Sequence, residues 1–170
     1  MLRFVIPLAA LAIVPCSPAH AQIQATGELE VLLQVNAACE VSGSQTGGIG
    51  TALLDFGSAD LLLEAIEADT GTSGIHAFEV LCNPGVGFTV EFGSGENATQ
   101  IDDRAMRLVS GDDLVRYQLY TDAGRGTVLD TVSGVGTGSP QAIQVFGRVP
   151  KQAAPRPGLY RDVVVITVTF

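Results

Sequence analysis

The sequence predicts an all-β fold, a β-sandwich, from three observations. Short apolar runs recur along the chain, clusters of Gly, Ser, Asn and Asp separate them, and stretches of helical periodicity are scarce. Runs of this length and spacing are typical of two-sheet sandwiches. We expect eight strands, at residues 28–35, 52–56, 75–81, 87–92, 105–109, 114–120, 142–149 and 162–170. Residues 60–67 fit either a strand or a helical turn that Asp60 would cap.

The first and last expected strands are long and apolar. The last, at 162–170, is rich in β-branched residues and runs to the final residue, Phe170. The first alternates, with only Leu32 out of phase, and its apolar face is formed by Leu29, Val31, Leu33 and Val35. An apolar strand at a sheet edge is a template for pairing with another chain. We therefore interpret the protein as a polymerising subunit and not as an enzyme.

The N-terminal residues 1–21 have the pattern of a secretory signal peptide. Arg3 supplies the positive charge, residues 4–14 are apolar, and Ala19-His20-Ala21 is a small-residue cleavage site. We expect cleavage between Ala21 and Gln22. The apolar segment, about eleven residues long, is too short for a membrane-spanning helix. The sequence therefore predicts export, with no membrane insertion of the mature chain.

Cleavage would leave two cysteines, Cys39 and Cys82, in the mature chain. In an oxidising compartment, two thiols of a small exported domain most simply form one disulfide. On the chain-entropy view a loop of this length contributes about 4 kcal/mol of stability. A metal site is the alternative, but His76 is the single histidine after residue 21 and there is no CxxC spacing.

Charge and motifs argue against several functions. The formal net charge is −9, so no basic patch is expected for nucleic acid or anionic membranes. The sequence has no GxSxG, no HExxH and no glycine-rich phosphate loop, and we expect no catalytic residue, metal or cofactor. The paired aspartates at 102–103 and 112–113 are interpreted as solvated turns, because neither pair lies in a regular loop of oxygen ligands.

Several segments together resemble a known family. Residues 35–45 (VNAACEVSGSQ) and 54–57 (LDFG) resemble the opening of the spore coat protein U domain. Further similar segments are FEVLC at 78–82, LVRYQLY at 114–120, VFGRV at 145–149, GLYRD at 158–162 and VTF at 168–170. The family includes subunits of the Csu-type, archaic chaperone-usher fimbriae. The similar segments occur in order over almost the whole of residues 22–170.

The resemblance implies an incomplete immunoglobulin-like β-sandwich that is completed by a donated strand. A periplasmic chaperone would lend this strand, and at an outer-membrane usher the N-terminal segment of the next pilin subunit would replace it. Residues 22–35 would be the donor segment, with Leu29, Val31, Leu33 and Val35 inserted, and residues 36–170 the sandwich domain. Val164, Ile166, Val168 and Phe170 would line the acceptor groove, where a basic chaperone would bind the carboxylate of Phe170. The implied location is the periplasm and then a fimbria on the cell surface.

Two alternatives to polymerisation stay open at this point. The N-terminal segment could fold back as an edge strand of its own domain, which would give a self-contained secreted sandwich. The domain could also be a carbohydrate-binding or adhesive module, although three tyrosines and no tryptophan offer few aromatic platforms.

Overall fold

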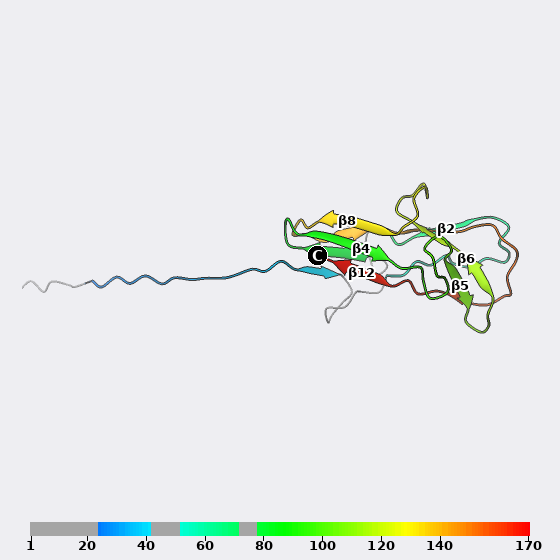
Figure 1. Ribbon diagram of the computed structural model, residues 1–170, viewed down its shortest axis with the longest axis horizontal. Helices are drawn as coiled ribbons and strands as arrows, with labels where there is room; N and C mark the ends of the chain where they lie inside the picture. The colour runs from blue at the N-terminus through cyan, green and yellow to red at the C-terminus, as the bar shows by residue number, and fades with distance from the viewer. Residues whose placement is uncertain (1–23, 42–51, 72–77) are drawn as a thin grey trace, which may run out of the picture. The chain divides into compact units, whose positions relative to one another are not determined.

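A computed structural model of the protein describes residues 24–41, 52–71 and 78–170. The chain divides into two units, Met1–Gln34 and Val35–Phe170, and all the strands described belong to the second. The described residues form strands and loops and contain no helix (Figure 1). The strands are β1 (Cys39–Val41), β2 (Ile66–Asp69), β3 (Phe78–Cys82), β4 (Gly87–Phe92), β5 (Ala105–Leu108), β6 (Leu114–Arg116), β7 (Gln118–Tyr120), β8 (Thr131–Val135), β9 (Gln141–Ile143), β10 (Phe146–Val149), β11 (Tyr160–Arg161) and β12 (Ile166–Thr169).

Two antiparallel sheets, β1-β3-β9 and β12-β4-β8, form a sandwich. Their central strands alternate strictly, because successive side chains of a strand point to opposite faces. The rings of Phe78 in β3 and Phe92 in β4 meet edge to face across the core, with centroids 6.4 Å apart. The inward side chains of the two central strands are all buried: Phe78, Val80, Cys82, Phe88, Val90 and Phe92. The sequence prediction of an all-β sandwich is confirmed.

Two further antiparallel sheets, β2-β10-β7 and β11-β5-β6, continue the domain. The expected strand at 52–56 is replaced by an extended segment that belongs to no sheet. Its residues Leu54 and Phe56 pack over Gly147 of β10, where an added Cβ would lie 2.7 Å from both side chains. Glycine at 147 therefore allows this segment to cross the sheet closely.

Three long expected strands are interrupted in the structure. The segment at 114–120 breaks at Tyr117, whose amide donates to the carbonyl of Arg104. The segment at 142–149 breaks before Phe146, where the Val145 amide donates to the Thr70 hydroxyl. The segment at 162–170 forms a ladder only over β12. Residues 60–67 contain no helix, and β2 begins at Ile66.

Strands β1, β8 and β11 were not among the expected strands, and β8 is the longest of the three. The glycines at 133–138 suggested a turn between strands. In the structure, however, Ser133–Val135 form the end of β8, which pairs with β4. Gly134 is needed there because the ring of Phe88 lies over it, and an added Cβ would be 2.4 Å from that ring. The glycine that suggested a turn is thus a packing requirement inside a strand.

Some sequence predictions lie outside the residues that the structure describes. These are the signal peptide at 1–21, the cleavage site between Ala21 and Gln22, and His76. Among the described residues there is no helix that is long and apolar enough to cross a membrane.

Candidate functional site: the open edge of the C-terminal strand

Strand β12 is an end strand of its sheet. Among the described strands it pairs with β4 alone, in the order β12-β4-β8, with Ile166 opposite Phe92 and Val168 opposite Val90. In Figure 1, β12 (red) and β1 (cyan) lie at the same margin of the sandwich, and β1 is likewise an end strand. We call the side of β12 that faces away from β4 the open edge.

The inward side chains of the C-terminal segment are less buried than those of the strand beside it. Val164, Ile166 and Val168 pack against the core cluster but remain half-buried. Their neighbours Val90 and Phe92 in β4 are 0% and 3% exposed. The difference follows from position, since a central strand has neighbours on both sides and β12 has one. Three of the four predicted groove residues therefore share an inward face, and they are only partly covered.

The backbone of β12 also points its unpaired groups toward the open edge. Gly93 donates its amide to the carbonyl of Val165 over 2.9 Å, so Val165, and by alternation Thr167 and Thr169, direct their backbone groups toward β4. The N–H and C=O groups of Ile166 and Val168 consequently face away from β4. The same two residues thus supply inward apolar side chains and outward hydrogen-bonding groups, which is what an added strand requires.

The edge of β1 has the same arrangement. Asn83 donates its amide to the carbonyl of Ala38, so Ala38 and Glu40 direct their backbone toward β3, and Cys39 and Val41 direct theirs away. Cys39 lies directly opposite Cys82 and forms a disulfide with it. The disulfide predicted from the sequence is present, and it fixes β1 to the central strand of its sheet.

Phe170 differs from the other predicted groove residues. It follows β12 and its side chain is 61% exposed. Val163 and Val165, which the sequence places on the outward face, are 37% and 67% exposed. An exposed aromatic residue therefore follows β12.

The predicted donor segment has no strand structure in the described part of the chain. Residues 24–38 are assigned to no strand. The predicted donor side chains are more than two-thirds exposed, at 87% for Leu29, 82% for Val31, 87% for Leu33 and 71% for Val35. Leu32, on the opposite face, is 81% exposed. An apolar, alternating segment with this exposure needs a partner to cover it.

A carboxylate that the sequence interpretation overlooked holds the C-terminal segment just before β12. Asp162 accepts hydrogen bonds from the Tyr117 hydroxyl (2.7 Å), the Asn97 side-chain amide (2.8 Å) and the Glu96 backbone amide (3.0 Å). Gly95 has φ +92° and would place a Cβ 2.0 Å from this carboxylate. Only glycine fits there, so the turn at 93–97 is shaped to hold Asp162.

Arg104 forms a second polar anchor next to this one. Its side chain is fully buried and donates to the carbonyls of Phe92, Gly93, Ile101 and Leu129 and to the Gln118 side chain. Burial lowers the pKa of Arg104 from its ordinary value. Burial also raises the pKa of Tyr117, and the hydrogen bond to Asp162 adds to that shift. Both anchors are structural, because their polar atoms are occupied by protein partners.

The described residues offer little for catalysis or metal binding. Among them no three His, Cys, Asp or Glu side chains gather as a metal site. The aspartate pairs form ion pairs, Asp103 with Arg116, Asp112 with Arg107 and Asp113 with Arg156. A pocket of about 440 Å³ beside these residues has two aromatic rings in its lining, and that of Tyr117 is only 7% exposed. This is a small aromatic surface for binding a sugar.

Fold and edge together define a class: an immunoglobulin-like β-sandwich domain whose C-terminal strand ends its sheet. Residues 25–167 match the Spore Coat Protein U domain family. The chain belongs to this family. It is 33% identical over 172 residues to Protein U of Myxococcus xanthus, with 95% of this chain and 93% of that protein covered.

A solved structure shares the fold. The match is to the complex of CsuC and CsuE, a chaperone and tip adhesion subunit from the archaic chaperone-usher Csu pili of Acinetobacter baumannii. The TM-score is 0.53 at 18% identity, and the aligned part covers 80% of this chain and 40% of that one. This chain therefore spans less than half of the matched structure's length.

Proposed function

We propose that the protein is a structural subunit of a surface fimbria, assembled by donor-strand complementation through a periplasmic chaperone and an outer-membrane usher. The observation that carries the proposal is the open edge of β12. There Ile166 and Val168 combine half-buried inward side chains with backbone groups that face away from β4. Membership of the Spore Coat Protein U domain family and the fold shared with a chaperone-usher pilus structure support it.

The donor in this proposal is residues 22–35 of a second copy. Their apolar side chains have the two-residue period of the inward positions on β12, so an inserted strand could fill the space beside Val164, Ile166 and Val168. Backbone hydrogen bonds would supply affinity and the inserted side chains specificity. Donor and acceptor lie on different parts of the chain, so repetition of the contact would produce a filament and not a closed dimer.

Before assembly, a chaperone strand would occupy the same edge. Without it, the subunit would expose apolar side chains and unpaired backbone groups that favour aggregation. The protein would be exported to the periplasm and then carried to the cell surface. The proposal assigns no catalytic role and no cofactor to the chain.

Co-expression with the chaperone of the same operon tests this proposal. The mature chain would be produced in a periplasm with and without that chaperone, and followed by yield and gel filtration. Loss or aggregation of the chain alone, with recovery as a one-to-one complex, is the expected result. A stable monodisperse monomer without chaperone would favour the self-contained secreted sandwich.

A further inference from the structure

The charges of this protein are segregated along the chain. After Arg3, every Lys and Arg falls between residues 104 and 161, and neither occurs at 4–103 or 162–170. The predicted donor segment carries Glu28 and Glu30. Donor segment and C-terminal strand therefore both lie in cation-free parts of the sequence.

In the folded domain, the two sheets that contain β1 and β12 carry acidic side chains and no Lys or Arg. In the sheets β1-β3-β9 and β12-β4-β8 the charged side chains are Glu40, Glu79 and Glu91, with no Lys or Arg in these six strands. Glu91 lies directly opposite Thr167 of β12. Glu40 is exposed on β1. All basic strand residues belong to the other two sheets, at Arg107, Arg116, Arg148 and Arg161.

Ion pairs do not neutralise the glutamates next to the two edges. Among the described residues every salt bridge joins side chains between Glu67 and Arg156. Glu40 and Glu91 take part in none of them. Among the described residues, Glu40 and Glu91 thus have no Lys or Arg ion-pair partner.

An incoming donor strand would place its polar face on this same surface. With Leu29, Val31 and Leu33 inward, Glu28 and Glu30 would point outward, because side chains alternate across a strand. Like charges on neighbouring strands are destabilising, and like-charged partners associate more slowly when salt is low. The repulsion does not depend on the register of insertion, since neither partner carries a cation there.

We propose that the open edge of β12 selects its occupant by charge: it favours a partner strand with outward-facing Lys or Arg and retards the chain's own segment 22–35. The proposal rests on the proposed function and specifies its regulation. A basic chaperone strand would then occupy the edge readily, while spontaneous pairing between free subunits would be slowed by Glu28 and Glu30 against Glu40 and Glu91. Charge would thus help to keep subunits from assembling before they reach the usher.

Assembly kinetics of the mature chain, residues 22–170, test this. Light scattering would follow self-assembly of chain freshly diluted from denaturant at about 10 mM and about 150 mM salt, where the Debye length falls from about 30 Å to about 8 Å, and electron microscopy would separate fibres from amorphous aggregate. We expect wild type to assemble about tenfold faster at the higher salt, the low end of the range for electrostatic effects on association rates. The E28Q/E30Q variant should assemble faster than wild type at low salt and depend less on salt.

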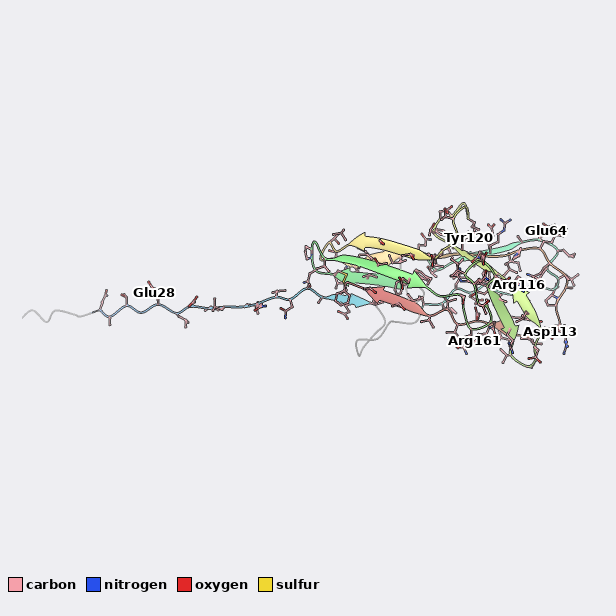
Figure 2. The ribbon with its side chains drawn as sticks, viewed as in Figure 1. Glu28, Glu64, Asp113, Arg116, Tyr120 and Arg161 are labelled. Carbon is pink, nitrogen blue, oxygen red and sulfur yellow. A yellow bond between two sulfur atoms is a disulfide. The ribbon has the colours of Figure 1, made fainter. Side chains whose placement is uncertain are left out.

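Two further variants test whether the change in assembly rate depends on the charges of the acceptor, the strands around the open edge. E40Q/E91Q should also accelerate assembly at low salt, whereas E64Q should not. The E64Q substitution also removes a carboxylate charge, but Glu64 lies in the loop before β2, away from β12 in Figure 2. Equal salt dependence of wild type, E28Q/E30Q and E40Q/E91Q would overturn the proposal and leave donor-strand assembly standing. Absence of assembly by every variant at both salt concentrations would overturn donor-strand assembly and this inference together.

Discussion

The hydroxyl of Tyr117 donates a 2.7 Å hydrogen bond to the carboxylate of Asp162, which lies between β11 and β12. Tyr117 comes from the break between β6 and β7, so this bond joins the C-terminal segment to a distant part of the domain. This partly buried hydrogen bond therefore helps to position the segment that leads into β12.

Removing the Tyr117 hydroxyl should destabilise the domain. Tyr117→Phe leaves one acceptor position of Asp162 without its donor, and hydrogen bonds to charged groups contribute about 1.5–3 kcal/mol. We expect a loss in that range in urea unfolding followed by circular dichroism. Tyr160→Phe is the matched control, because its hydroxyl bonds an exposed carbonyl of Arg156 and should contribute less. Equal losses for the two variants would contradict a special role for the Tyr117 contact.

The same tyrosine should make stability depend on alkaline pH. The pKa of Tyr117 in the folded protein is raised above the ordinary value of 10.0, first by burial and then by Asp162. The unfolded chain therefore loses this proton at lower pH than the folded one. The stabilising effect is fully present below about pH 10 and declines as pH rises above it. Urea titrations between about pH 9 and 11 should show this decline in wild type, and Tyr117→Phe should reduce its slope.

Arg104 should tolerate no substitution, including lysine. It donates to four backbone carbonyls and the Gln118 side chain from a fully buried position, and a lysine ammonium cannot reproduce this planar set of donors. We expect Arg104→Lys to cost about 3 kcal/mol or more, because buried carbonyls lose their partners. Arg161→Lys, at an exposed position, should change stability by less than about 0.5 kcal/mol. Unfolding midpoints for both variants check this, and similar midpoints would show that the Arg104 contacts contribute little.

The disulfide should support β1 more than any single contact there. Replacing Cys39 and Cys82 together by alanine removes a cross-link between residues 43 apart, for which about 2–4 kcal/mol is typical. The reduced wild type should show a similar loss in urea unfolding. If neither reduction nor replacement changes the unfolding midpoint, the bond is not a determinant of stability.

Charge placed on the inward face of β12 should prevent partner binding. Val168→Asp would put a carboxylate among core side chains, where an unpaired charge costs several kcal/mol. Thr169→Asp adds the same charge at an exposed position one residue later. We expect Val168→Asp to abolish recovery of the chaperone complex in co-purification and Thr169→Asp to retain it. Recovery of both complexes would exclude the inward face of β12 as the binding surface.

The sequence predicted the parts of this account that depend on local alternation. Val164, Ile166 and Val168 share one inward face, although the groove role that the resemblance implies for them and for Phe170 stays a prediction, and the paired cysteines form the expected disulfide. Alternation could not show where ladders end, because breaks at Tyr117 and Asp162 are set by partners far along the chain. Asp162 bonds residues 45 to 66 positions away, and no local pattern encodes those distances. Gly134 suggested a turn and not a strand for a similar reason, since the residue it packs against, Phe88, lies in another strand.

Deletion of residues 22–34 tests the central claim most directly. The shortened chain should keep the open edge of β12, bind the chaperone and accept the N-terminal segment of a full-length mature subunit, but form no fibre by itself. When it is mixed with full-length subunits, fibres seen by electron microscopy should become shorter as its proportion rises, because each shortened chain can accept but not donate. Fibres formed by the shortened chain alone would contradict the account.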